Sequence, residues 1–396
     1  MYKNTWSLAI FIIVAVLVGS ASGFAQVLNI AIPQDPDSFD PVKAVAAATG
    51  EIAFNIYEGL VKATPEGGVE GALATHWTVD ETGTLYTFYL RDALFHDGTK
   101  LGPEDVVYSL NRARDVDVSV RAGELGMIEA VKALDQAVEI QLTEPNGAFI
   151  YSLSEVYASI YPAHAGDLAR KPVGTGPYVL EEWLPNQHLV LRRFDDHWSG
   201  KTPYFAEARF LLIPDENSMV LNLKAGRVDL IPRLEVGVLH QVERDPALEV
   251  LSFPMNLVQV FSINNARAPF NDLRVRKALA LGVNRDEILL GAGWGLGTLL
   301  DSALSPAMSG FYNGNLAEEN PYDPVRAKEL LKEAGQENLS LTLTLPANYP
   351  LHVQAGELVA EQWKALGIDV DLQIVEWGTW LERVYTQRDY DVSVIG

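Results

Sequence analysis

The sequence predicts an α/β fold divided into two or three domains, and three observations support this. The chain has 396 residues, 48% of them hydrophobic, which is enough for a sizeable buried core. Its middle third contains short apolar segments separated by turn residues, which is typical of strands. Its last third alternates segments of helical and strand periodicity, which is typical of β-α-β units.

The first 25 residues differ from the rest of the chain. Lys3 is their only charge, and an apolar run from Leu8 to Val18 leads into small residues ending at Ala25. This pattern indicates a secretory signal peptide, with cleavage expected near Ala25. An uncleaved membrane anchor is the alternative, but a run of eleven residues is short for crossing a bilayer. The chain has no cysteine, so we expect neither disulfides nor a lipid-modified cysteine, and the mature protein should be free in solution.

The chain is strongly acidic. Its formal net charge of −22 becomes −23 once Lys3 is removed with the leader. Nucleic acid is therefore an improbable partner, because binding it depends on cationic side chains. Acidity of this kind more simply reflects solubility than attraction of a cationic ligand.

The first elements after the leader are expected in the following order. Residues 28–33 predict a buried strand, and the turn-rich segment 35–41 leaves it as a loop of the kind that often carries binding groups. Residues 85–90 predict a second strand, and Asp97 and Gly98 a turn. A helix should begin at Pro103, with acidic residues in its first turn and basic residues near its end.

The middle of the chain predicts a small sheet followed by a helix. The strands are expected at 178–183, 189–194 and 208–213, and the helix at 215–226 with Gly226 as its end. The glycines of the segment 174–178 predict a bend, because that segment lacks the lysine and hydroxyl residue of a phosphate loop. The glycine-rich segment 291–297 does not match a dinucleotide fingerprint and is interpreted as a surface loop or a flap beside a ligand.

The last third predicts an α/β domain. Asp323 should cap a helix that has Pro324 at its first position and ends at Gly335. A strand at 341–345, a helix at 351–366 and a strand at 368–374 form the expected β-α-β unit. A further helix at about 379–387 and a strand at 390–395 continue it, and we expect that last strand to leave an unpaired hydrophobic edge.

The sequence offers no catalytic or metal centre. His96 lies beside Asp92 and Asp97 but has no second histidine at ligand spacing, so a histidine that ties a tight turn is the preferred interpretation. No serine elbow, cysteine nucleophile or paired acid and base stands out, so we expect no enzyme, no metal and no cofactor. An exported hydrolase remains as the improbable alternative.

Seven blocks, in one consistent order along the mature chain, resemble a known family: 56–60, 73–77, 88–112, 172–178, 223–229, 270–279 and 322–335. The chain is similar to the extracytoplasmic solute-binding proteins of the peptide/nickel type (family 5), which serve ATP-driven (ABC) importers. The resemblance implies a two-lobe, periplasmic-binding-protein-like fold (class II, cluster C) with an extra inserted domain. Domain I would comprise 26–54 and 175–260, the insertion 55–174, and the second lobe 261–396.

The resemblance also implies a function. Such receptors are periplasmic, and this one should capture a short peptide between its lobes and deliver it to membrane permease subunits, acting as a monomer. A nickel complex, haem or an oligosaccharide is an alternative ligand. A sensory or chaperone-like protein that hands its ligand to a chemoreceptor is an alternative role.

The candidate ligand-binding residues follow from the resemblance and from loop positions. Trp377 is the first choice, because peptide-binding relatives have a tryptophan lining the pocket after the corresponding strand, although a place in the lobe core is equally compatible with its type. The other candidates are Asp35, Asp37, Ser38, Phe39, Tyr57, Ser262 and Asn264. Asn264 and Tyr178 could instead be hinge residues.

The resemblance also predicts a feature beyond this sequence. In peptide-binding relatives the chain runs on and carries a Trp-x-x-Asp element whose carboxylate holds the amino terminus of the peptide. Here the sequence stops at Gly396. We therefore expect an incomplete sequence rather than a natural short form, and the aspartate cannot be named.

Overall fold

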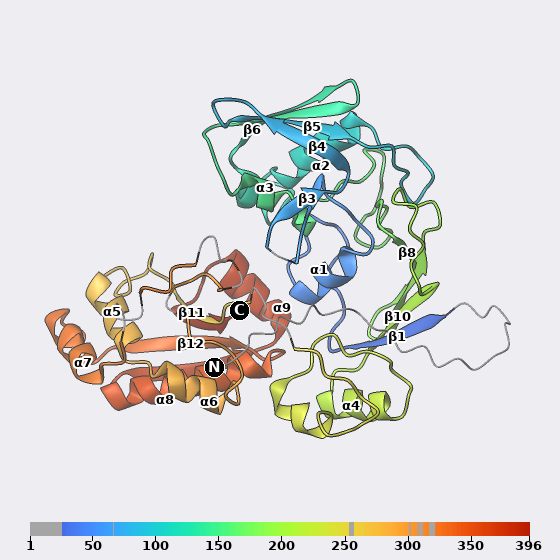
Figure 1. Ribbon diagram of the computed structural model, residues 1–396. Helices are drawn as coiled ribbons and strands as arrows, with labels where there is room; N and C mark the ends of the chain where they lie inside the picture. Colours follow the sequence, from blue (N-terminus) through green and yellow to red (C-terminus); the bar gives the residue numbers. More distant parts are fainter. Residues whose placement is uncertain are drawn as a thin grey trace, which may run out of the picture.

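The computed structural model describes residues 26–396 except 66, 253–256, 301, 307, 309–311 and 317–320. Figure 1 shows three parts, each built around its own sheet. We call them the first lobe (β1, α1, β8–β10 and α4), the inserted part (β2–β7, α2 and α3) and the second lobe (β11–β14 and α5–α9). No helix among the described residues is long and apolar enough to cross a membrane.

The first-lobe sheet has the strand order β1-β10-β9-β8. Its strand β1 (Val27–Ile32) runs parallel to β10 (Glu207–Leu212), which is antiparallel to β9 (His188–Arg193), itself antiparallel to β8 (Tyr178–Leu184). One face packs on a core that includes residues of α1 (Ala47–Ala53). The helix α4 (Glu216–Lys224) packs on the other face through Met219. The chain therefore leaves this lobe after α1 and returns to complete its sheet.

The inserted part is an antiparallel sheet with the order β4-β5-β7-β6. The strands are β4 (Ala74–Val79), β5 (Leu85–Leu90), β6 (Ile128–Leu134) and β7 (Ala137–Leu142), with a small hairpin of β2 (Val61–Ala63) and β3 (Val69–Gly71) beside them. The helix α2 (Pro103–Ala113) contributes Val106 and Leu110 to the core of this part, and the short helix α3 (Phe149–Ser152) contributes Phe149. The predicted strand at 85–90 and the helix beginning at Pro103 are confirmed.

The second lobe contains the β-α-β unit that the sequence predicts. Strand β12 (Ser340–Pro346), helix α8 (Pro350–Leu366) and strand β13 (Asp369–Val375) follow one another, and the two strands are parallel. The second lobe also contains the helices α5 (Leu273–Leu281), α6 (Arg285–Gly291) and α7 (Pro324–Glu333). The buried indole of Trp363 on α8 donates to the carbonyl of Leu279 at the end of α5, at 3.0 Å, so helix and sheet layers share one core.

The expectation of an unpaired edge at the last strand is wrong. The sheet order is β11-β14-β12-β13, so β14 (Val392–Ile395) lies inside the sheet. It pairs parallel with β12 on one side and antiparallel with β11 (Val260–Ile263) on the other. The prediction failed because β11 comes from a segment far earlier in the chain.

The last predicted helix begins two residues earlier than expected. Helix α9 spans Trp377–Trp380, and the carboxylate of Glu376 caps it by accepting from the backbone N–H groups of Gly378 and Thr379 at 3.0 and 3.3 Å. The chain then continues as a π-helical turn, Leu381–Thr386. Such turns are rare and occur frequently at functional sites.

His96 joins the two glycine-containing blocks of the sequence. Its Nδ1 accepts from the backbone N–H of Gly174 at 3.3 Å, so the proton is on Nε2, which donates to the carbonyl of Gly176 at 2.9 Å. Burial lowers the pKa of His96 to about 4, which keeps the ring neutral. Gly174 and Gly176 lie so close to the backbone of residues 55 and 56 that a side chain at either position would overlap it.

An ion pair fastens the inserted part to the first lobe. The guanidinium of Arg112 on α2 donates to both carboxylate oxygens of Asp40, at 2.7 and 2.6 Å, and also to the hydroxyl of Tyr161 at 3.1 Å. The two charged side chains are only 20% and 6% exposed. A bidentate, largely desolvated pair of this kind fixes orientation as well as distance.

Candidate functional site

The first lobe and the second lobe meet at a small group of polar and aromatic side chains. We call it the lobe junction, and it consists of Gln34, Asp37, Glu51 and Arg233 from the first lobe and Tyr349 and Trp377 from the second. The direct link is a hydrogen bond in which the amide of Gln34 donates to the Tyr349 hydroxyl at 3.2 Å. Gln34 follows β1 by two residues, and Tyr349 lies between β12 and α8.

The second-lobe side of the lobe junction is aromatic. The Tyr349 and Trp377 rings meet edge to face with centroids 5.1 Å apart, and Trp377 stacks on Trp380 at 5.2 Å. The indole N–H of Trp380 donates to Ser393 of β14 at 3.0 Å, which anchors the stack to the sheet. The indole N–H of Trp377 is buried and has no hydrogen-bond partner among the described residues. A buried donor without a partner is costly in a folded protein, so this N–H group is suited to donate a hydrogen bond to a ligand oxygen.

The electrostatics of the lobe junction involve both lobes. Burial raises the pKa of Tyr349, the hydrogen bond from Gln34 and the charge of Arg233 lower it, and the charge of Asp37 raises it. The Tyr349 hydroxyl therefore stays neutral and lies within electrostatic range of two oppositely charged first-lobe side chains.

The loop after the first strand is held by its own side chains. Asp35 accepts from the indole N–H of Trp183 at 3.4 Å and from the backbone of Asn186. Asp37 accepts from the Thr49 hydroxyl at 2.5 Å and from the backbone N–H groups of residues 45 and 46 at 2.8 and 3.1 Å, which fixes the chain before α1. Of the four loop candidates, Asp37 is the one whose charge acts on Tyr349 of the second lobe, where it raises the pKa.

Ser38 and Phe39 complete this loop. The Ser38 hydroxyl accepts from the backbone N–H of Asp40 at 3.1 Å. Phe39 is 0% exposed and packs edge to face against Trp183 with centroids 5.1 Å apart. In this conformation Phe39 supports the loop from inside the first-lobe core and offers no surface to a ligand.

Of the remaining predicted residues, Ser262 and Asn264 lie together beside Tyr390, whereas Tyr57 lies in the first-lobe core. Tyr57 is 1% exposed in the first-lobe core, and its buried hydroxyl has no partner at the residues that the structure describes. Ser262 on β11 hydrogen-bonds the Tyr390 hydroxyl at 3.2 Å, and Asn264 donates to the carbonyls of residues 388 and 390 at 2.9 and 3.1 Å. The Tyr178 hydroxyl donates to the carbonyl of Phe205 within the first lobe. The ligand-binding or hinge roles of these four residues stay predictions.

A second contact joins the inserted part to the second lobe. The guanidinium of Arg121 lies 5.8 Å from the ring centroid of Tyr385, which is carried by the π-helical turn. Arg121 also pairs with Glu124 at 3.8 Å. Residues 377–386 therefore contact the inserted part through Tyr385, while Trp377 packs on Tyr349, the second-lobe residue that bonds Gln34 of the first lobe.

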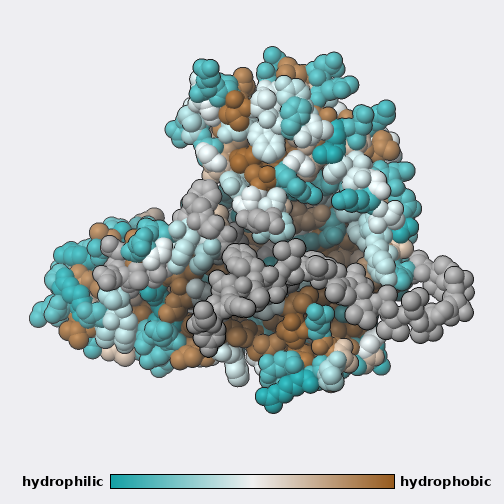
Figure 2. Space-filling view, viewed as in Figure 1, coloured by the Kyte–Doolittle hydropathy of each residue, from teal (hydrophilic) through white to brown (hydrophobic). Residues whose placement is uncertain are grey.

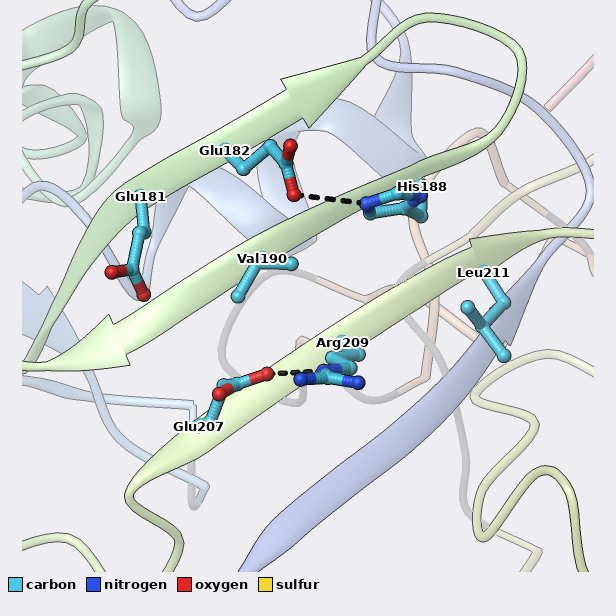
Figure 3. A pocket seen from close by; sticks show the side chains of 7 residues that line it. All are labelled: Glu181, Glu182, His188, Val190, Glu207, Arg209 and Leu211. Carbon is cyan, nitrogen blue, oxygen red and sulfur yellow. Dashed lines mark hydrogen bonds and ion pairs between the residues drawn. The ribbon is translucent and has the colours of Figure 1, made fainter.

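Two surface cavities lie away from the lobe junction. One, of about 320 Å³, covers the open face of β8–β10, where Figure 3 shows Glu182 pointing at His188 and Glu207 at Arg209. The other, of about 530 Å³, lies between α2 and β6. The charges in the first cavity are largely paired with one another, and no cluster of metal-ligating side chains occurs among the described residues. We place no candidate site in either cavity.

On the face in Figure 2, hydrophilic residues cover the outer ends of the second lobe and the inserted part, and hydrophobic residues gather in the lower middle, above α4.

Sequence reasoning missed Gln34, Arg233, Tyr349 and Tyr385. Tyr349 could have been found, since ligands of open α/β sheets bind beyond the carboxyl ends of the strands, and Tyr349 and Trp377 follow β12 and β13 there.

Comparisons with known proteins agree with this arrangement. Residues 68–396 match the family model of bacterial extracellular solute-binding proteins, family 5 (middle). The chain is 28% identical to the dipeptide-binding protein of Escherichia coli K12, over 96% of this chain and 78% of that protein.

Two solved structures have the same fold along most of the chain. The periplasmic binding protein AgaA of A. tumefaciens R10, solved with agropinic acid, has a TM-score of 0.85 and 26% identity, covering 93% of this chain and 77% of its own. The binding protein DppA of Helicobacter pylori, solved with the peptide STSA, has a TM-score of 0.84, 26% identity and the same coverage. The two lobes, the lobe junction between them and the matched family model together establish that this chain belongs to the family 5 extracellular solute-binding proteins of ABC importers.

Proposed function

We propose that this protein captures short peptides at the lobe junction and delivers them to the permease subunits of an ABC importer. The observation that carries the proposal is the hydrogen bond between Gln34 and Tyr349 beside the indole N–H of Trp377, which has no partner within the described part of the chain. Peptide backbones supply carbonyl oxygens for such a donor, and aromatic walls accept side chains of varied shape. The relatives named for dipeptides and solved with the peptide STSA support this ligand class.

The proposal also covers the cellular location and the oligomeric state of the protein. We propose that residues 1–25 are a signal peptide cleaved near Ala25 and that the mature protein acts in the periplasm as a monomer. We further propose the domain limits 26–54 with 175–260, 55–174 and 261–396. The separate sheets of the three parts support this division, and the return of β8–β10 to pair with β1 supports the insertion.

Ligand capture would work by closure of the lobes. A ligand that contacts both lobes favours the closed arrangement, because it gains contacts there that the open arrangement lacks. We propose Trp377 and Asp37 as ligand contacts, together with Gln34 and Tyr349; the hydrogen bond between the lobes, the packing of Trp377 on Tyr349 and the charge of Asp37 near Tyr349 support this choice.

The test is a ligand panel read by thermal shift and then by calorimetry. Purified protein is mixed with di-, tri- and pentapeptides, nickel with and without a chelating carrier, haem and cello-oligosaccharides. A peptide present at a hundred times its Kd should stabilise the protein by about 2.7 kcal/mol. A shift with nickel, haem or sugar and none with peptides would overturn the peptide assignment while leaving the receptor class intact.

Two tryptophan substitutions test where the peptide binds. Trp377→Phe removes the unpartnered N–H and part of the aromatic wall, so it should weaken peptide binding roughly tenfold. Trp77→Phe makes the same chemical change on β4 of the inserted part and should leave binding unchanged. Equal effects of the two substitutions would refute the proposed place of the ligand.

A further inference from the structure

The inserted part and the second lobe touch each other at Arg121 and Tyr385. The guanidinium carbon of Arg121 lies 5.8 Å from the centroid of the Tyr385 ring. A guanidinium within about 6 Å of an aromatic ring centroid is attracted by the negative face of the ring. This cation–π contact joins two parts that have separate sheets and separate cores.

The second lobe holds Tyr385 firmly. The ring is carried by the π-helical turn Leu381–Thr386, in which the neighbouring Val384 is buried. The turn continues directly from α9, whose Trp380 donates to Ser393 of β14 at 3.0 Å. In Figure 1 this helical segment lies at the edge of the second lobe that faces the inserted part. Tyr385 is therefore fixed relative to the second-lobe sheet.

The inserted part holds the backbone of Arg121 in the same way. The next residues form a 3-10 turn, Ala122–Leu125, whose first and last side chains are buried. The backbone N–H of Arg121 donates to the Ser119 hydroxyl at 3.1 Å. The Arg121 side chain is 30% exposed, so the guanidinium stands at the surface of the inserted part, where the second lobe can reach it.

A role within the inserted part alone is the competing explanation for Arg121. Its Nη1 lies 3.8 Å from a carboxylate oxygen of Glu124, and its charge partly offsets the rise that burial causes in the pKa of Glu155. The Glu124 side chain is 52% exposed, and exposed ion pairs contribute little to stability. Neither carboxylate belongs to the second lobe, so neither accounts for the contact with the Tyr385 ring.

We propose that Arg121 and Tyr385 form a latch that holds the second lobe closed against the inserted part and slows the release of a bound ligand. Opening of the second lobe would carry Trp377 and Tyr385 away together, because both belong to one continuous helical segment. It would therefore break the latch as it uncovers the ligand. A contact made only in the closed arrangement shifts the population toward that arrangement.

This inference rests on the proposed capture of a ligand by lobe closure, and it makes the inserted part a third element that controls closure. The latch touches no ligand in this scheme. It should therefore change the closed fraction of the protein and the rate of ligand release, and leave the choice of ligand unchanged.

The experiment measures the distance between the inserted part and the second lobe by single-molecule fluorescence energy transfer. The natural sequence has no cysteine, so dyes can be attached selectively to Glu81→Cys and Glu337→Cys, at exposed positions of the two parts. The ratio of closed to open molecules is recorded first without ligand. The release rate of a bound tripeptide is then measured by competition with unlabelled tripeptide.

The variants separate the latch from other effects of the same side chains. Arg121→Met and Tyr385→Leu should each lower the closed-to-open ratio about two- to fivefold, the range expected for one exposed cation–π contact, and should speed release equally. The double variant should show no larger effect than either single variant. Tyr385→Phe keeps the ring and should behave as the wild type. Arg170→Met is the matched control, because it removes a guanidinium 4.2 Å from the Trp183 ring centroid, a contact that involves no second-lobe residue.

The outcomes distinguish this inference from the proposed function. An unchanged closed-to-open ratio in Arg121→Met and Tyr385→Leu, additive effects in the double variant, or one invariant population in every variant would overturn the latch. Absence of tripeptide binding would refute the peptide function, while the ratio without ligand would still decide on the latch. Thermal unfolding at the wild-type temperature would exclude misfolding of the variants as the cause of a loss.

Discussion

Breaking the ion pair between Asp40 and Arg112 should lower the stability of the protein, because this pair holds the inserted part on the first lobe. Asp40→Asn preserves the shape of the side chain but removes its charge. Arg112 then keeps the hydrogen bond to the Tyr161 hydroxyl and at most one good acceptor at position 40. The guanidinium would stay in its site without a counter-charge, which is the costly way to break such a pair.

The expected size follows from the exposure of the two side chains. Removing one partner of a fully buried pair costs about 3–5 kcal/mol. The Asp40 side chain is 6% exposed, but that of Arg112 is 20% exposed and can still reach water, so the lower end applies. We expect Asp40→Asn to lower the free energy of unfolding by about 3 kcal/mol.

The assay is urea unfolding followed by circular dichroism at neutral pH. The control is Glu70→Gln, which breaks the pair Lys62–Glu70 at 3.0 Å, where both side chains are more than half exposed. That control should cost below about 1 kcal/mol. The double variant Asp40→Asn with Arg112→Met removes the stranded charge and should recover part of the loss. An effect of Asp40→Asn no larger than that of Glu70→Gln would refute the reasoning.

Three further predictions concern the lobe junction and the joint at residue 174. Tyr349→Phe removes the bond from Gln34 and should weaken ligand binding about two- to tenfold by calorimetry. The buried His96 has a pKa of about 4 against an ordinary 6.5, so between these two pH values the unfolded chain binds more protons than the folded chain. The contribution of neutral His96 to the free energy of unfolding is therefore complete above pH 6.5 and is lost as the pH falls toward 4. His96→Gln should flatten this pH dependence in urea titrations. Gly174→Ala should cost more than about 2 kcal/mol, because its Cβ would overlap backbone, whereas Gly147→Ala meets open space and should be near neutral.

Each of these predictions has a clear contrary result. Unchanged affinity in Tyr349→Phe would mean that the bond between the lobes contributes nothing to capture. A pH profile of His96→Gln that parallels the wild type would assign the acid sensitivity to other groups. Equal stability of the two glycine variants would show that the backbone near residue 56 can move aside.

Local signals explain which elements could be predicted from the sequence. The sequence predicts helix α7 from its cap residue Asp323, from Pro324 at its start and from Gly335 after its end. In the structure, Asp323 accepts from the backbone N–H of Arg326 at 2.9 Å, and Gly335 has a φ of 69°. The start of α9 was missed because its cap is Glu376, a residue type outside the usual cap set. The neighbours of β14 could not be predicted, because they depend on pairing with a distant segment rather than on local sequence.

The candidate site likewise contains residues that the sequence predicts and residues that it does not. Trp377 was named from the family resemblance, and it lies at the lobe junction. Gln34 and Arg233 carry no motif of their own, and they come near Tyr349 only when two lobes from different parts of the chain are assembled. Phe39 was proposed for a ligand because it lies in a loop, but an aromatic residue in a loop can equally be the anchor that packs the loop onto the core.

The interior position of β14 also has a consequence for the order of folding. Ser262 on β11 meets Tyr390 beside β14 across 128 positions of sequence, so the second-lobe sheet cannot be completed until both segments have been synthesised. Pairings over such separations must overcome the entropy of closing a long loop, which makes them slow. Until β14 arrives, β11 has no partner in this sheet and one edge of β12 is open. The β-α-β unit from β12 to β13 can form first, and β11 must wait to be captured by the strand that arrives last.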